Sequence, residues 1–200
     1  MNNPKQQIPQ IKVVLLGDEA VGKTSLLRKW TSNVYEPNQA STIGGAAQIR
    51  RDQVNGVQYS FQIWDTAGAE RYRALAPLYA RDSYSALVVF DMTRRRTFES
   101  LEYWSQFLHT HGQIPFIIVG NKSDLTDSLE ITSEEATNYA FSVSSQFFET
   151  SAKLGDNVDL AFRQLEMSAV EYYQKKGPIA EQVTMAVNSP GQNAGKGECC

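Results

Sequence analysis

Residues 17–24 have a spacing suited to binding phosphate. They read Gly-Asp-Glu-Ala-Val-Gly-Lys-Thr, which matches GxxxxGK[ST], between an apolar run at 11–17 and a helical pattern. Backbone N–H groups of such a loop surround a phosphate at a helix N-terminus; Lys23 adds positive charge, and the Thr24 hydroxyl suits Mg²⁺. The alternative is a glycine-containing turn with a surface lysine, but strand, loop and helix together favour a phosphate loop. Its predicted nucleotide-binding residues are Glu19, Ala20, Val21, Gly22, Lys23, Thr24 and Ser25.

Asp65 ends another apolar run and precedes Thr66-Ala67-Gly68. At the carboxyl edge of a sheet it would lie beside the phosphate loop, where a carboxylate can hold Mg²⁺ through water. The alternative is an ordinary turn residue, which an aspartate at a strand end commonly is. Because the phosphate loop is also present, we favour the metal role.

The run Asn121-Lys122-Ser123-Asp124 follows the apolar segment PFIIVG. A carboxylate at this position can accept two hydrogen bonds from the N1 and N2 edge that guanine presents and adenine lacks. The alternative is a polar turn after a buried strand. The run is therefore a candidate site for selecting GTP over ATP.

The elements that must position these residues follow from the hydropathy pattern. Apolar runs at 11–17, 85–91 and 115–120 predict buried parallel strands. Helical periodicity predicts helices at 23–31, 97–109, 133–143 and 157–174, the third opened by a capping box of Thr132 and Glu135. Strands that alternate with helices indicate an α/β fold, an open sheet covered on both faces.

One strand is expected to run against the others. Two strand-like runs within residues 46–65 flank Asn55-Gly56, a strong hairpin signal that makes one edge strand antiparallel. Residues 146–153 supply a sixth strand. The predicted fold class is a single α/β domain with a six-stranded, mostly parallel sheet, one antiparallel edge strand and helices on both faces. We expect a flexible N-terminus at 1–10, the domain at 11–176 and a disordered tail at 177–200.

Composition narrows the function classes. The formal charge is −3, from 19 basic and 22 acidic residues, which gives no electrostatic footprint for nucleic acid. The two cysteines, Cys199 and Cys200, are adjacent at the end of the sequence, so we expect no disulfide or zinc cluster inside the fold and a reducing cytosol. No apolar run has the length of a membrane span, and the first ten residues lack the apolar region of a secretory signal. Membrane contact would therefore need a covalent lipid.

Four motifs in order and spacing resemble those of Ras-superfamily GTPases: the phosphate loop, DTAG, NKSD and Ser151-Ala152-Lys153. The resemblance covers residues 11–174 and implies a GTP/GDP-binding G domain that uses Mg²⁺. It implies that Thr42, eighteen residues after Thr24, ligates Mg²⁺ and senses the γ-phosphate, and that Tyr35 covers guanine. The implied metal ligands are Thr24, Thr42 and Asp65, and the hydrolysis positions are Lys23, Thr42, Gly68 and Ala69. Beyond the phosphate loop, the implied nucleotide contacts are Tyr35, Thr42, Gly68, Asn121, Lys122, Asp124, Ser151, Ala152 and Lys153.

Within that superfamily the sequence is similar to Rab proteins. The strings SFQIWDTAG, ERYRALAPLYARDS and VVFDMT resemble Rab sequence, and LAPLYARDS resembles the early-endosomal branch. The ending GECC resembles the Rab double-cysteine ending and implies prenylation of Cys199 and Cys200. Two lipid chains anchor stably where one is marginal. The alternative is two unmodified thiols.

The resemblance also implies partners and a location. A Rab-like protein is expected to meet an exchange factor, a GTPase-activating protein, a GDP-dissociation inhibitor or escort protein, and effectors, and to be a monomer. It would lie on the cytoplasmic face of intracellular membranes, endosomal ones by the branch resemblance, and cycle with the cytosol.

Three positions depart from the family pattern. Ala69 stands where the family has the glutamine that orients the attacking water, so we expect slow intrinsic hydrolysis. Glu19 replaces a small residue and puts a carboxylate near the γ-phosphate, unless its side chain turns to solvent. Ala47 replaces the phenylalanine that forms an effector-facing triad with residues that align with Trp64 and Tyr79.

These observations leave three functions. The favoured one is a two-state switch in which GTP·Mg²⁺ orders residues 36–47 (switch I) and 66–80 (switch II) through Thr42 and Gly68. The second is a membrane-recruited scaffold that holds GTP almost permanently, which Ala69 and Glu19 favour. The third is an ATP-dependent kinase or ATPase, against which NKSD and SAK argue.

Overall fold

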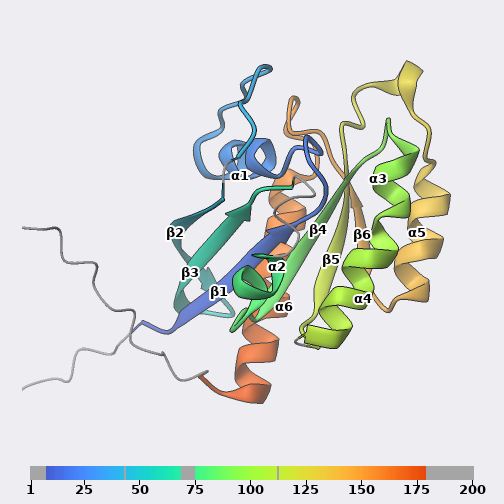
Figure 1. The fold of residues 1–200 in the computed structure, drawn as a ribbon. Coiled ribbons are helices and arrows are strands. Elements are labelled where there is room, and N and C mark those ends of the chain that lie inside the picture. Colours follow the sequence, from blue (N-terminus) through green and yellow to red (C-terminus); the bar gives the residue numbers. More distant parts are fainter. Residues whose placement is uncertain (1–7, 43, 69–74, 112, 179–200) are drawn as a thin grey trace, which may run out of the picture.

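The structure is a computed structural model that describes residues 8–42, 44–68, 75–111 and 113–178. Its order is strand, helix, hairpin, and then strands alternating with helices (Figure 1). The strands are β1 (Gln10–Leu16), β2 (Gly45–Val54), β3 (Val57–Thr66), β4 (Ser85–Asp91), β5 (Phe116–Asn121) and β6 (Gln146–Glu149). The α-helices are α1 (Lys23–Ser32), α2 (Ala76–Ala80), α3 (Arg95–Glu99), α4 (Leu101–His111), α5 (Ser133–Ser142) and α6 (Val158–Lys176), with a 3₁₀ turn, η2, at Thr126–Ser128.

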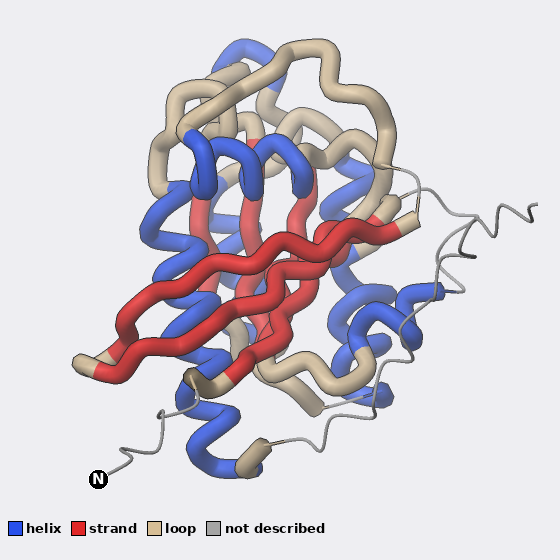
Figure 2. The backbone as a smooth tube through the Cα atoms, turned by 90° about the vertical axis from the view of Figure 1, so that its left-hand side faces the viewer, coloured by secondary structure: helices blue, strands red, loops and turns tan. Residues whose placement is uncertain are grey.

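The strands form one sheet in the order β2-β3-β1-β4-β5-β6. Every neighbouring pair is parallel except β2 and β3, which form the long hairpin that crosses the front of the molecule in Figure 2. The hairpin turns at Asn55 and Gly56, both with positive φ, as a two-residue Asn-Gly turn requires. The predicted fold class is therefore confirmed, including the antiparallel edge strand.

Each face of the sheet has its own apolar core. On one face α1 and α6 pack on inward residues such as Val13, Leu15 and Phe61, and the Trp30 and Phe162 rings stack at 4.3 Å. On the other face α2, α4 and α5 pack on residues such as Val14 and Val88. β4 is buried along its whole length, as expected for a central strand covered on both sides.

The structure corrects two of the predicted element bounds. The helix predicted at 97–109 is split at Ser100, whose hydroxyl donates to Asp18 Oδ2 at 2.7 Å, and the two parts span 95–111. The strand predicted at 146–153 ends at Glu149. Beyond it, Ser151 donates to Asp124 and the Ala152 N–H donates to Asn121. The five-residue helix α2 was not predicted, since it is too short to have a readable period.

The predicted capping box is half present. Thr132 is the N-cap of α5, and its side chain accepts a hydrogen bond from the Glu135 N–H at 3.1 Å. The Glu135 side chain pairs with Arg95 rather than turning back to the cap. Among the described helices, none combines the length and the apolar character that crossing a membrane would require.

Candidate functional site

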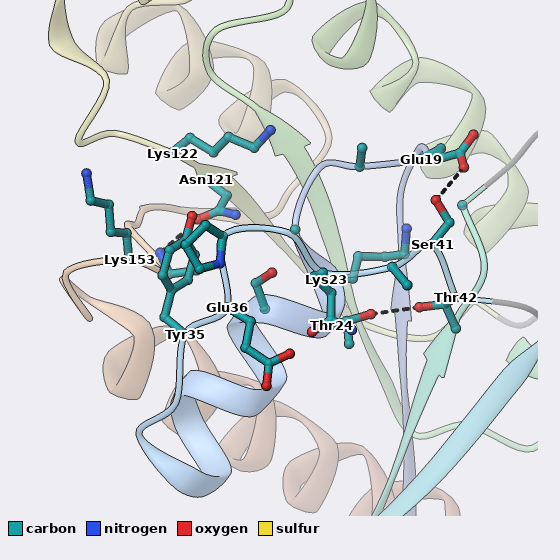
Figure 3. A pocket seen from close by; sticks show the side chains of 18 of the residues that line it. Glu19, Lys23, Thr24, Tyr35, Glu36, Ser41, Thr42, Asn121, Lys122 and Lys153 are labelled. Atoms are coloured by element: carbon teal, nitrogen blue, oxygen red, sulfur yellow. Dashed lines mark hydrogen bonds between the residues drawn. The ribbon is translucent and has the colours of Figure 1, made fainter.

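A cavity of about 520 Å³ opens at the carboxyl edge of the parallel strands (Figure 3). Four parts of the chain surround it: the phosphate loop with the start of α1, the segment 35–42, the end of β3 with Gly68, and the loops after β5 and β6. It is lined by Glu19, Ala20, Gly22, Lys23, Thr24, Ser25, Tyr35, Glu36, Pro37, Gln39, Ala40, Ser41, Thr42, Thr66, Gly68, Asn121, Lys122, Asp124, Leu125, Ala152 and Lys153.

Lys23 lies at the floor of the phosphate loop. Its ammonium donates to the carbonyl oxygens of Gly17 and Asp18, each at 2.8 Å, and the side chain is 5% exposed. Burial lowers the pKa of Lys23 to about 8, although carboxylates such as Asp65 act in the opposite direction. Gly68 lies directly against this loop, because a Cβ there would be 2.2 Å from the Asp18 oxygen and 2.5 Å from Lys23 Nζ. A buried ammonium held by backbone carbonyls can receive a phosphate oxygen.

Three oxygen-bearing side chains meet beside Lys23. The Thr24 hydroxyl is 2.6 Å from Asp65 Oδ2 and 2.8 Å from the Thr42 hydroxyl. Within the described residues Asp65 Oδ1 is buried and has no hydrogen-bond partner, and burial raises the pKa of Asp65 despite the Thr24 hydrogen bond and the Lys23 charge. An orphaned carboxylate oxygen beside two hydroxyls fits a hard divalent cation such as Mg²⁺.

The loops after β5 and β6 are joined by side chains. Asn121, 1% exposed, donates to the Val21 carbonyl at 2.9 Å and accepts from the Ala152 N–H at 3.1 Å. Ser151 donates to Asp124 Oδ1 at 2.7 Å, and Lys153 Nζ lies 3.8 Å from Asp124 Oδ2. Asn121 thus fixes the phosphate loop against both of these loops, and Asp124 is held at the cavity wall.

Gly22 allows the phosphate loop to approach Asn121 closely. Its φ of +102° is unfavourable for other residues, and a Cβ would lie 2.2 Å from Asn121 Nδ2. Any larger residue at this position would push the phosphate loop away from Asn121 at the end of β5.

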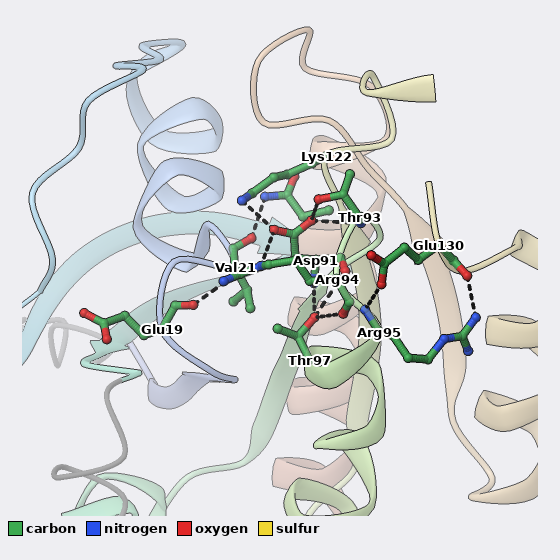
Figure 4. A network of polar contacts seen from close by, with 10 residues as sticks. Glu19, Val21, Asp91, Thr93, Arg94, Arg95, Thr97, Lys122 and Glu130 are labelled. Atoms are coloured by element: carbon green, nitrogen blue, oxygen red, sulfur yellow. Dashed lines mark hydrogen bonds and ion pairs between the residues drawn. The ribbon is translucent and has the colours of Figure 1, made fainter. Parts of the chain in front are cut away.

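Asp91 anchors a polar network that sequence reasoning missed (Figure 4). Its Oδ2 is 2.6 Å from Lys122 Nζ and 2.8 Å from Arg94 Nε, and Arg94 also donates to the Glu19 carbonyl at 3.0 Å. Burial acts to raise the pKa of Asp91, but hydrogen bonds from Lys122 and Thr93 and the Lys122 charge outweigh it and lower the pKa. The signal was present, since Asp91 ends a buried strand just as Asp65 does. The Lys122 ammonium therefore pairs with Asp91, and its stem lines the cavity.

The segment before Thr42 covers the mouth of the cavity. Tyr35, 37% exposed, lines it near Asn121 and Lys153 (Figure 3). The sequence analysis predicted nucleotide contacts at Tyr35 and Thr42 but none between them. It therefore missed five lining residues: Glu36, Pro37, Gln39, Ala40 and Ser41. The Glu19 residue is exposed at the edge of the cavity, where Ser41 donates a hydrogen bond to its carboxylate at 2.9 Å.

The predicted effector-facing surface has a small side chain, that of Ala47, where the family has an aromatic one. Ala47 on β2 is paired directly with Trp64 on β3, and the Trp64 and Tyr79 rings are 6.1 Å apart. Tyr79 lies on the β2 backbone, since a Cβ on Gly45 would be 2.6 Å from its ring. Two members of the expected aromatic triad are therefore neighbours, while the third position carries a methyl group.

Most predicted site residues line this one cavity. Val21 and Ser151 do not line it, because both are fully buried and support it from behind, and Asp65 lies beneath it next to Thr24. Ala69, Cys199 and Cys200 lie outside the described residues. No group of three or more His, Cys, Asp or Glu side chains that could hold a metal occurs in the described ranges, and the predicted Mg²⁺ ligands are one carboxylate and two hydroxyls.

The fold and the site define a class of protein: an α/β nucleotide-binding domain built on a phosphate loop. Residues 12–171 match the model of the Ras family. The chain is 42% identical to mouse Ras-related protein Rab-22A, covering 78% of this chain and 81% of that protein. It is 39% identical to human Ras-related protein Rab-25 and 38% identical to Arabidopsis thaliana Ras-related protein RABA5a, each over 94% of this chain and 92% of the relative. The chain therefore belongs to the Ras family, and within it to the Rab small GTPases. Proteins of this family hydrolyse GTP.

Proposed function

We propose that this chain is a GTP/GDP switch that regulates vesicle traffic on endosomal membranes and hydrolyses GTP slowly without an activating protein. The proposal rests on one observation: three different chemical groups lie at the same cavity. They are the buried ammonium of Lys23, the oxygen cluster around Asp65, and the carboxylate of Asp124. The first suits phosphate, the second Mg²⁺ and the third guanine.

In this proposal Asp124 selects the base. Its carboxylate is held by Ser151 and accepts hydrogen bonds from guanine N1 and N2, while adenine offers no matching donors. Asn121, Lys122, Ala152 and Lys153 complete that end of the cavity, and Tyr35 covers the base.

The other end of the cavity binds the phosphates. Backbone N–H groups of residues 19–25 and the Lys23 ammonium surround the β- and γ-phosphates. Thr24 and Thr42 would hold Mg²⁺ directly and Asp65 through water, and the ion would neutralise charge on the phosphates when bound. Thr42 and Gly68 are the residues that would sense the γ-phosphate, so the loss of that group releases switch I and switch II.

Slow hydrolysis follows from the residue at position 69. Ala69 has no polar group to position the attacking water, whereas Lys23 still stabilises charge on the transferred phosphoryl group. The site would therefore bind GTP well and turn it over poorly on its own.

Prenyl groups on Cys199 and Cys200 would carry the protein to the membrane. An escort protein or GDP-dissociation inhibitor would cycle it with the cytosol, and an exchange factor, an activating protein and effectors would read the switch regions of the monomer. The similarity to Rab-22A and the LAPLYARDS string favour the endosomal branch.

A second candidate function is a scaffold that stays bound to GTP. The observations that favour it are Ala69 and the Glu19 to Ser41 contact at the cavity edge. The two candidates differ in the nucleotide that co-purifies: GDP indicates completed hydrolysis, and GTP indicates that hydrolysis stalls.

Calorimetric titration of nucleotide-free protein with GTP, GDP and ATP in the presence of Mg²⁺ tests the proposed site. We expect tight binding of both guanine nucleotides and at least a hundredfold weaker binding of ATP. Equal affinity for ATP and GTP would overturn the assignment of Asp124 and with it the switch proposal.

A further inference from the structure

Residues 36–42, which we call the strap, are fastened at both ends by side chains of the protein. At one end Arg28 on α1 donates through Nη1 to Glu36 Oε2 at 2.5 Å and to Gln39 Oε1 at 2.6 Å. At the other end the Ser41 hydroxyl donates to Glu19 Oε1 at 2.9 Å. Figure 3 shows the Glu19 and Ser41 side chains pointing toward one another at the edge of the cavity.

Neither anchor uses an atom of a nucleotide. In the proposed switch the γ-phosphate holds the strap through Thr42 alone, and Ser41 is the residue directly before it. A contact that holds Ser41 also restrains Thr42, whichever nucleotide is bound. The strap therefore has a closed position that the protein itself stabilises.

The two anchors reinforce each other although the Arg28 to Glu36 and Ser41 to Glu19 contacts are both exposed to solvent. The Arg28 and Glu36 side chains are 38% and 54% exposed, so their ion pair alone contributes little. Both anchors act on the same seven residues, and once one end is fixed, closing the other end costs less chain entropy. Glu19 is also tied in place, because Arg94 donates to its carbonyl at 3.0 Å.

We propose that Glu19 is a positioning residue that, together with Arg28, slows the opening of the strap once the γ-phosphate is lost. Slower opening of the strap then slows GDP release, although loss of the γ-phosphate still frees Thr42. The inference rests on the proposed binding of guanine nucleotides in this cavity.

Two measurements on the full chain loaded with GDP and Mg²⁺ test this proposal. Release of a fluorescent GDP into excess unlabelled GDP reports opening, and amide hydrogen exchange of residues 36–42 reports closure. We expect the wild-type strap with GDP to be measurably protected, although less than with a non-hydrolysable GTP analogue. Ser41→Ala should speed GDP release about three- to tenfold and lower that protection by a similar factor.

Variants at position 19 distinguish loss of the Glu19 to Ser41 contact from loss of the negative charge of Glu19. Removing a carboxylate beside the phosphates would by itself slow GDP release, so faster release from Glu19→Ser identifies loss of the contact. Glu19→Gln removes the charge but keeps an accepting oxygen and should release GDP no faster than wild type. The double variant Glu19→Ser with Ser41→Ala should match the faster single variant, since both remove one interaction. Glu134→Ser, on the exposed start of α5, is the matched control and should behave as wild type.

Three results would overturn the proposal: slower release from Glu19→Ser, additive effects in the double variant, or an unprotected strap in wild-type GDP protein. The experiments distinguish failure of the strap proposal from failure of the proposed function. If calorimetry gives tight GDP binding while the strap exchanges freely, the strap proposal alone fails; if GDP does not bind, the proposed function fails.

Discussion

The Ser151 hydroxyl donates a 2.7 Å hydrogen bond to Asp124 Oδ1 and so joins the loops that follow β6 and β5. Asp124→Asn places an amide donor where guanine needs an acceptor. We expect at least tenfold weaker GTP binding, since losing a hydrogen bond to a charged group costs about 1.5–3 kcal/mol. Binding of xanthosine triphosphate, whose corresponding edge offers an acceptor, should improve. Calorimetry with GTP and with xanthosine triphosphate measures the change in nucleotide preference.

The matched control is Asp127→Asn, an identical change in the exposed turn η2, outside the cavity lining. It should leave both affinities unchanged. If Asp124→Asn also leaves GTP affinity unchanged, Asp124 does not read the base.

Sequence patterns predicted the sheet well because its signals are local. Continuous apolar runs identified the buried strands, and Asn55-Gly56 identified the hairpin. The break at Ser100 was not readable from periodicity; there the Ser100 hydroxyl contacts Asp18, 82 residues away in sequence. The strand after α5 was predicted too long, and beyond its end Ser151 pairs with the distant Asp124.

The site residues that lie in sequence motifs were predicted, whereas the side-chain contacts that join one motif to another segment were missed. Thr24, Asp65 and Asp124 have positions set by spacing along the chain, and all three gather at the carboxyl edge of the sheet. The Asp91 to Lys122 pair and the Glu19 to Ser41 contact join distant segments through single side chains. No periodicity encodes such contacts, because they depend on how the loops meet after folding.

The cysteine pair gives a prediction about the membrane. Replacing Cys199 and Cys200 with serine should leave GDP affinity unchanged and move the protein from membranes to cytosol. Each single replacement should give partial release, because one lipid chain anchors marginally. Fractionation of cells and intact-mass spectrometry of the membrane fraction measure these outcomes. Two unmodified thiols in membrane-derived wild-type protein would rule out lipidation.

Glu166 gives a prediction about stability. Its side chain on α6 is 2% exposed, its Oε1 has no partner among the described residues, and Arg163 lies 3.4 Å from its Oε2. Burial, with the nearby charge of Asp52, raises the pKa of Glu166 to about 7 from 4.5, although Arg163 and Arg50 oppose the change. In the unfolded chain the Glu166 carboxyl ionises above pH 4.5, whereas in the native state it stays protonated up to about pH 7. The contribution of Glu166 to the free energy of unfolding therefore falls as the pH rises from 4.5 to about 7.

Glu166→Gln removes that penalty and should stabilise the protein by about 1–3 kcal/mol at pH 8, with little gain near pH 4.5. Thermal or urea unfolding at both pH values, at one fixed GDP concentration, measures the difference. Glu171→Gln, at an exposed position of the same helix, is the matched control and should change stability by less than about 0.5 kcal/mol at both pH values. An equal gain from Glu166→Gln at both pH values would mean that ionisation of this carboxyl is not the cause.

Hydrolysis gives the last prediction, and it concerns Ala69. Phosphoryl transfer in this family depends on a water held in line with the γ-phosphate, and a methyl group cannot hold it. Ala69→Gln should raise the intrinsic single-turnover rate about 10- to 100-fold, equivalent to about 1.4–2.8 kcal/mol of barrier, while GTP affinity stays the same. Ala69→Leu adds bulk without a polar group and should give no increase. An activating protein of the TBC class, which brings its own glutamine and arginine, should accelerate wild type nearly as much as the glutamine variant. If Ala69→Gln hydrolyses GTP no faster than Ala69→Leu, another group positions the water, and Ala69 does not limit the intrinsic rate.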